Sequence, residues 1–451
     1  MQQVPTGGPR ARLRFGRFDY AAFLTFASYA ASSLAIPVVL VEMAEDLRFP
    51  LLEGGMATGG SFQVVRSLAM CASMVFAGFA AARWGNRRSL GVAVGTMGVG
   101  LLLCAFAPSY LLVLPALLFA GLGEGVVEGL GTPFVQDMHR DDPGRYVNFT
   151  HGFWSLGTFA FALLAGAALV WRVHWRAILA AVALVALLPV LLLFLPSRTP
   201  YPERAQADPP SRTWRRLVEL LRTRRFWLFF AAMFFAGGGE YCLTFWSTSF
   251  VRLNFRTSAF AGAFGTAAFS AGMFLGRTGF GSYVPQRQLK RLVVTVGLFG
   301  AAVSALVVPF ALHADALPPG AVKPALFLLL FLCGVGSAPF WPSIQSLCVD
   351  RLPRLDSTLA FIVLSCAGVP GCGFFTWLMG LAGDRFGLAR SFALVPLSYL
   401  IMVALVLAAA PARRGRSGSN GMVRGLRFAQ TEVRTCASRS GGTVYRKRGE
   451  D

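Results

Sequence analysis

Charged residues are scarce in this chain. Asp, Glu, Lys and Arg make up 14% of its 451 residues, whereas a soluble domain usually carries about 25%. Acidic residues are the scarcer kind, 21 against 42 Lys and Arg. Hydrophobic residues, in contrast, make up 55% of the chain. This composition excludes an ordinary soluble domain and predicts a membrane protein.

Motifs for cofactors and metals are also lacking. No GxxxxGK[ST] phosphate loop occurs, which argues against an ATP-driven pump. The eight cysteines show no spacing that is typical of a metal site or a disulfide framework. We therefore expect no cofactor and no metal.

Long apolar segments dominate the chain instead. A helix of about 20 residues spans the roughly 30 Å hydrocarbon core of a bilayer. Twelve segments are long enough, at approximately 19–42, 56–82, 89–107, 109–136, 147–171, 177–196, 226–252, 258–283, 290–312, 323–347, 358–381 and 390–410. The first is too long for the core of a cleaved signal peptide. The predicted fold class is therefore an all-α membrane protein with twelve transmembrane helices.

The basic residues predict how the chain is oriented. With the N-terminus inside, the inner segments hold most of the Lys and Arg, even when the long central loop and the tail are left out. Because cytoplasmic loops accumulate these residues, both termini are predicted to be cytoplasmic. The net charge of +21 then reflects this bias and attraction to anionic lipid, and not binding of nucleic acid. The expected location is the bacterial inner (plasma) membrane.

A polar central loop separates six predicted spans from six others. Trp214, Leu217, Val218 and Leu221 lie there at helical spacing, which predicts a short helix on the inner membrane surface. The tail has few apolar residues and is expected to be disordered. The predicted divisions are an N-terminal stretch (1–18), a first six-helix half (19–196), the central loop (197–225), a second six-helix half (226–410) and the basic tail (411–451).

The two halves repeat each other in sequence. Pro115 and Gln136 of span four return in span ten as Pro324 and Gln345, both 209 residues later. The loop after span two returns after span eight at an offset of 203, and span five returns in span eleven at an offset of 214. Two six-helix halves related by an axis along the membrane normal enclose a central site in known transporters. The repeat therefore predicts a transporter with parallel-related halves, and not an enzyme.

The loop after span two carries a pattern of glycines and arginines. Its members are Gly78, Arg83, Gly85, Arg87 and Arg88. This pattern resembles the signature of the major facilitator superfamily, and the likeness in organisation covers roughly residues 18–410. The resemblance implies that superfamily's fold and a gating role for these residues. Ala82 replaces the acid of the signature, and Pro285 stands at the corresponding position of the second half.

Two glutamates, Glu124 and Glu128, lie well within predicted span four. Their spacing of four places them on one helical face. A charge near the bilayer centre costs about 2.5 to 3.5 kcal/mol or more, so both are expected to face the interior. Two neighbouring carboxylates in a low dielectric resist being ionised together, so one of them could carry a proton. Alternatively, Glu128 pairs permanently with Arg66 of span two.

The residues around Glu128 form a second pattern, Gly121, Leu122, Gly123, Glu128, Thr132, Pro133 and Phe134. They resemble the fucose permease-like sugar:proton symporters, and this resemblance implies that Glu128 binds substrate and proton. It extends to Asn148, His151, Phe153 and Gly157 of span five, while Glu240 and Trp246 resemble a glutamate-then-tryptophan pattern of related sugar permeases. Thr132 stands where the group has Asn. In span one, no acid stands where the group carries a second proton-linked aspartate; Tyr29, Ser32 and Ser33 offer hydroxyls there.

The predicted site therefore combines carboxylates, amides, an imidazole and indoles. Its substrate and proton residues are Glu124, Glu128, Glu240, Asn148, His151, Gln136, Gln345, Trp154, Trp246 and Trp341, and Arg66 and Arg277 join the gating and charge network. The alternative for the polar residues is a structural hydrogen bond, for the indoles packing or interfacial anchoring, and for Arg277 a helix-end anchor that reaches the membrane surface. The prolines and glycines of 334–342 predict a span that is able to bend.

Two functions remain in view. The first is transport of a small solute, a sugar by the resemblance, through alternating access with proton symport. The second is proton-coupled efflux of amphipathic drugs or metabolites, which the aromatic content and the missing acid in span one favour. A scaffold that transports nothing would have no reason to keep acids inside the membrane. The expected partners are the solute, protons and membrane lipid, and the protein is expected to act as a monomer.

Overall fold

Long helices make up the described part of the chain. The computed structural model describes residues 13–140, 143–196, 201–202, 210–284, 288–353 and 357–410, and no strand occurs within these ranges. The helices are α1 (Arg17–Asp46), α2 (Met56–Trp84), α3 (Asn86–Phe106), α4 (Tyr110–Met138), α5 (Pro143–Val170), α6 (Trp175–Val185), α7 (Leu187–Phe194), α8 (Pro210–Arg222), α9 (Arg224–Asn254), α10 (Ala259–Tyr283), α11 (Leu289–Ala305), α12 (Val307–Leu312), α13 (Pro319–Ser337), α14 (Phe340–Arg351), α15 (Ser357–Phe386), α16 (Leu388–Ser391) and α17 (Leu394–Ala409). They supply 12 segments long and apolar enough to cross a membrane, which confirms the predicted all-α, multi-pass membrane protein.

Four of the twelve spans consist of two consecutive helices: α6 with α7, α11 with α12, α13 with α14, and α16 with α17. The break in span ten falls between Ser337 and Phe340. Pro339 and Pro342 lie at and after this break, and each lacks the amide N–H that would continue the helical ladder. The helix is therefore interrupted within the stretch that was predicted to bend.

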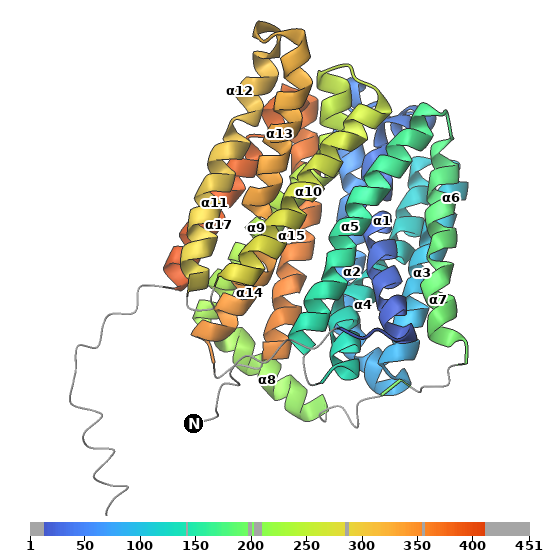
Figure 1. Ribbon diagram of the computed structural model, residues 1–451, viewed down its shortest axis with the longest axis vertical. Coiled ribbons are helices and arrows are strands. Elements are labelled where there is room, and N and C mark those ends of the chain that lie inside the picture. The colour runs from blue at the N-terminus through green and yellow to red at the C-terminus, as the bar shows by residue number, and fades with distance from the viewer. Residues whose placement is uncertain are drawn as a thin grey trace, which may run out of the picture. The chain divides into compact units, whose positions relative to one another are not determined.

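The first six spans and the last six stand side by side (Figure 1). α1 and α9 are their most deeply buried members, with 83% and 67% of their apolar windows inside the protein. Helix ends show the repeat independently of the sequence matches. Arg48 follows α1 and Arg256 follows α9, 208 residues later, and both have the left-handed φ (62° and 49°) that often ends a helix.

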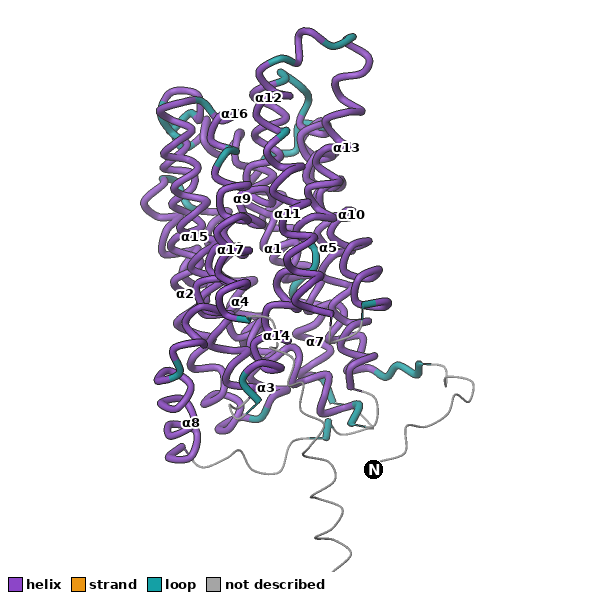
Figure 2. The backbone as a smooth tube through the Cα atoms, turned by 90° about the vertical axis from the view of Figure 1, so that its left-hand side faces the viewer, coloured by secondary structure: helices purple, strands orange, loops and turns teal. Residues whose placement is uncertain are grey.

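The α8 end of the bundle is defined here as the end where α1 begins, α2 ends and α8 lies; the opposite end is the far end (Figures 1 and 2). α8 lies within the central loop, which confirms the predicted helix there. The tail, 411–451, and the predicted N-terminal residues 1–12 lie outside the described ranges.

The two halves touch closely toward the far end. A Cβ at Gly60 of α2 would lie 2.8 Å from the Trp377 Cα of α15, and one at Gly380 would lie 2.4 Å from the Met56 carbonyl oxygen. Toward the α8 end, a Cβ at Gly279 of α10 would meet no atom within 4 Å. The halves therefore meet closely at the far end.

Candidate functional site

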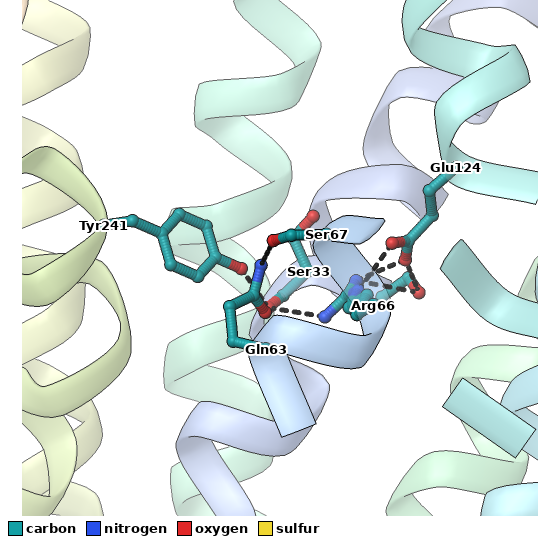
Figure 3. A network of polar contacts seen from close by, with 7 residues as sticks. Ser33, Gln63, Arg66, Ser67, Glu124 and Tyr241 are labelled. Carbon is teal, nitrogen blue, oxygen red and sulfur yellow. Dashed lines mark hydrogen bonds and ion pairs between the residues drawn. The ribbon is translucent and has the colours of Figure 1, made fainter. Parts of the chain in front are cut away.

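An ion pair between Arg66 of α2 and Glu124 of α4 lies inside the first half (Figure 3). Arg66 Nε donates to Glu124 Oε2 at 2.5 Å, and Nη2 donates to Oε1. The Ser32 hydroxyl of α1 donates to the same carboxylate. The side chains of Arg66 and Glu124 are 3% and 0% exposed. The sequence had offered Glu128 as the partner of Arg66, and the structure corrects this: the partner is Glu124.

Glycines explain why Glu124 reaches the arginine. A Cβ at Gly121 would lie 2.5 Å from the Arg66 carbonyl oxygen, and one at Gly125 would lie 2.1 Å from that of Met70. This face of α4 therefore lies directly on α2. Glu124 lies between these two glycines in sequence, so its side chain is brought next to Arg66.

The carbonyl oxygen of Ser33 connects this ion pair to the second half. Pro37, four residues later in α1, has no N–H and therefore cannot make the usual helical hydrogen bond to Ser33. Instead, this oxygen accepts from Arg66 Nη1 at 3.3 Å and from the Tyr241 hydroxyl of α9 at 3.2 Å (Figure 3). Sequence reasoning missed Tyr241, although the proline signals an acceptor four residues before it.

A second ion pair, between Arg277 of α10 and Glu240 of α9, lies in the second half. Arg277 Nη2 is 3.0 Å from Glu240 Oε1. Arg277 Nε donates at 3.2 Å to the carbonyl of Ala338, which Pro342 leaves without its helical partner. The guanidinium carbon also lies 5.3 Å from the ring centre of Trp154, which belongs to α5 of the first half. Arg277 therefore points into the protein and bridges the halves, and does not extend to the membrane surface.

Glu240 has an unused acceptor. Its Oε2 atom is buried and has no hydrogen-bond partner among the described residues. A buried carboxylate oxygen without a donor is costly. A solute hydroxyl, a water molecule or a proton would satisfy it.

Glu128 is in a different situation from Glu124, one helical turn away. It is partly exposed, and no ion pair of this residue occurs among the described residues. Tyr29 of α1 is within hydrogen-bonding reach, and Arg277 is close enough for its charge to act on the carboxylate. Because Arg277 belongs to the other half, Glu128 faces the region between the halves.

His151 of α5 also belongs to this region. Its Nε2 lies 2.9 Å from Thr132 Oγ1 of α4, its ring contacts Phe26, and it is exposed. Arg277 is close enough for its charge to act on it. The side chain of Asn148, a further predicted residue, lies outside the described part of the structure.

The three predicted tryptophans differ. Trp154 and Trp341 are partly exposed, and Trp341 packs where Gly368 of α15 leaves room for its ring. Trp246 is 0% exposed and donates its N–H to the Thr376 carbonyl at 3.0 Å. Trp246 is therefore a packing residue here, contrary to the prediction, because α9 is enclosed by neighbouring helices.

The two repeated glutamines lie apart from the carboxylates. Gln136 is eight residues beyond Glu128, about 12 Å along the helix, and is exposed. Gln345 donates to Ser365 Oγ at 3.0 Å within the second half. The prediction of a common small-molecule site requires Gln136 to lie beside Glu128, and the structure does not place it there.

The predicted loop pattern lies at the α8 end. Gly85 has a φ of 80° that favours glycine, and the Arg87 guanidinium lies 5.5 Å from the Phe18 ring centre. Arg83 and Arg88 are exposed, and a Cβ at Gly78 would meet no atom within 4 Å. Sequence reasoning missed Asp137 of α4, which accepts from Asn86 Nδ2 at 2.6 Å and from the Tyr201 hydroxyl at 3.2 Å. Asp137 thus ties the loop to α4.

Two polar contacts fasten the halves together at the far end. Arg252 of α9 and Glu42 of α1 form an ion pair at 2.7 Å. The carboxylate of Asp384, on α15, accepts from the backbone N–H groups of Met56 and Ala57 at 2.8 Å each. Asp384 thereby caps the first turn of α2 from the opposite half. These residues were also missed, because nothing in their spacing distinguishes them from ordinary loop charges.

Comparisons with known proteins support the fold. A family model described as Major Facilitator Superfamily matches residues 21–355. No curated protein matches the chain in sequence. Similar solved structures include a variant of the fucose:proton symporter of E. coli (15% identity, 88% of this chain and 100% of that one, TM-score 0.57). They also include a variant nucleoside transporter (14%, 87% and 98%, 0.69) and the xylose transporter of E. coli (13%, 89% and 99%, 0.67). At these identities the likeness is one of fold.

Proposed function

Because the chain belongs to the major facilitator superfamily and is therefore a membrane transporter, we propose that it carries a small polyhydroxylated solute, a sugar, by alternating access with proton symport. The observation that carries the proposal is the contrast between two carboxylates four residues apart. Glu124 is buried and neutralised by Arg66, whereas Glu128 is partly exposed and forms no ion pair among the described side chains. Glu128 is thus the carboxylate free to gain and lose a proton.

The solute would lie between Glu128 and the Arg277–Glu240 pair. Glu240 Oε2 lacks a donor that a sugar hydroxyl would supply. The partly exposed ring of Trp154 offers an apolar face beside the same pair. When Glu128 is protonated, the opposite charges of Arg277 and Glu240 cancel. The site then has no net charge, which suits a neutral solute. Two of the similar structures are named for sugars, fucose and xylose.

Proton coupling follows from the exposure of Glu128 to alternate sides. In this arrangement the halves are sealed at the far end, so Glu128 exchanges protons through the α8 end. The positive-inside rule assigns that end to the cytoplasm, which makes this the inward-open state with both termini inside. When the halves rock, the same carboxylate would be presented to the outside.

Transport in proteoliposomes tests the proposal. Labelled hexoses and deoxyhexoses are offered with and without an inward proton gradient to the wild type, Glu128→Gln and the exposed-loop control Glu53→Gln. We expect the gradient to stimulate uptake in the wild type and the control. Glu128→Gln should lose that stimulation but keep sugar exchange without a gradient, because binding and rocking remain.

Two results would overturn parts of this proposal. If a folded wild type takes up no sugar, the substrate assignment is wrong. If uptake responds neither to the gradient nor to Glu128→Gln, the protein is not a proton symporter that uses this residue.

A further inference from the structure

Three sulfur atoms meet between the halves, apart from the carboxylate site. Cys71 and Met74 lie on α2, and Cys366 lies on α15. Cys366 Sγ is 4.0 Å from Met74 Sδ. Cys71 Sγ donates to the Cys366 carbonyl at 3.7 Å, and the two thiols interact with each other. The first half thus supplies a thiol and a thioether, and the second half supplies a thiol.

The backbone explains this meeting. Cys71 and Met74 are three residues apart, so they share one face of α2. Pro370, four residues after Cys366, cannot donate to its carbonyl, and the Cys71 thiol occupies that acceptor instead. The position of the sulfur cluster therefore follows from one helical spacing and one proline.

The cluster lies within the contact between α2 and α15. That contact extends from Met56 at the far end to this point. One turn further along α2, Phe76 and Phe79 are 64% and 61% exposed. Cys71 and Cys366 are partly exposed themselves. The two thiols are therefore partly accessible, whereas Met74 is buried (2% exposed).

We propose that Cys71, Met74 and Cys366 form a binding site for one soft monovalent cation of the Cu(I) or Ag(I) type. Thiolate and thioether ligands favour such ions over hard cations. With the metal–sulfur distance of zinc thiolates, about 2.3 Å, a three-coordinate plane would place the sulfur atoms about 4 Å apart. The Cys366–Met74 separation of 4.0 Å already has this value. Each thiol that becomes a ligand releases its proton to water, so binding is accompanied by proton release.

Occupancy of this site would oppose the rocking of the halves. Its ligands come from α2 and α15, which belong to opposite halves, and an ion held by both joins them in the arrangement seen here. A ligand stabilises the state that it binds best. The cation is therefore an inhibitor of transport, whatever the transported solute is.

Calorimetric titration with Ag(I) in chloride-free buffer tests the site without relying on transport. All proteins carry Cys436→Ser, because this tail cysteine could bind the probe independently. We expect one high-affinity Ag(I) per chain, with at least tenfold weaker binding in Cys71→Ser, in Cys366→Ser and in Met74→Leu. The matched control is Cys333→Ser, a buried cysteine of α13, which should bind Ag(I) as the parent does. Melting temperatures in detergent verify that each variant is folded.

The outcomes separate clearly. The site is overturned if folded Cys71→Ser and Cys366→Ser still bind Ag(I) with high affinity. It is also overturned if the parent protein shows no high-affinity binding. Loss of binding in these variants but not in Cys333→Ser supports it. Because this experiment measures binding of Ag(I), its result does not depend on the sugar and proton assignments.

Discussion

At the scale of single residues, the site depends on two carboxylates one helical turn apart. Their spacing predicted that Glu124 and Glu128 both face the interior, and the structure confirms this. It did not predict which of them pairs with Arg66. That choice depends on the rotation of α4, which the glycine contacts at Gly121 and Gly125 determine. The sequence shows these glycines but does not state which neighbouring helix they pack against.

Removing one member of the Arg66–Glu124 pair should destabilise the fold. Glu124→Gln leaves a buried guanidinium without its counter-charge, and breaking such a pair typically costs about 3 to 5 kcal/mol. Glu128→Gln removes no ion pair and should melt like the wild type. Melting temperatures in detergent compare the two variants. If Glu124→Gln melts as high as Glu128→Gln, the Arg66–Glu124 pair is not the structural one.

At the scale of helices, prolines leave backbone acceptors that side chains of neighbouring helices use. Three carbonyl oxygens, of Ser33, Ala338 and Cys366, lie four residues before a proline, and each accepts a side-chain donor instead. The prolines were visible in the sequence. The donors were not, because they come from helices distant in the chain.

A double-mutant cycle tests this role of Pro37. Tyr241→Phe removes a hydrogen bond worth about 0.5 to 1.5 kcal/mol. In a Pro37→Ala background, the new amide competes for the Ser33 carbonyl, so Tyr241→Phe should cost less. Denaturant unfolding in detergent measures both differences. Pro115→Ala, in a different helix, is the control background and should leave the cost of Tyr241→Phe unchanged. Equal costs in all three backgrounds would contradict the proposed competition.

At the scale of the whole molecule, much of the fold could be predicted from the sequence. Twelve apolar segments and a repeat with rising offset were sufficient for the spans, and helix ends at Arg48 and Arg256 show the same repeat. The closed far end was not predictable. A transporter sequence must permit both open states, so the spacing of its residues does not select one. The contacts that close it join residues far apart in the chain: Asp384 of α15 and Met56 of α2, for example, are over 300 positions apart.

The far-end contact by Asp384 makes a measurable prediction. Asp384→Ala removes two hydrogen bonds from the backbone N–H groups of Met56 and Ala57. Hydrogen bonds to a charged group contribute about 1.5 to 3 kcal/mol, so these amides should exchange with deuterium at least about tenfold faster. Hydrogen-exchange mass spectrometry of the first turn of α2 measures this change. Asp315→Ala, an exposed residue, is the control and should leave the exchange rate as in the wild type. Unchanged rates in Asp384→Ala would show that the capping contact is not maintained in solution.

The close approach of α2 and α15 at Gly60 and Gly380 has a consequence for the energy balance of the cell. A carrier keeps ion gradients intact only if its two ends are never open together. A side chain at either glycine would push the helices apart at the far end, and in the inward-open state that we propose both ends would then be open together. Water and ions would then have a continuous path across the bilayer. The absence of a Cβ at Gly60 and Gly380 thus keeps the far end closed and prevents a leak of ions.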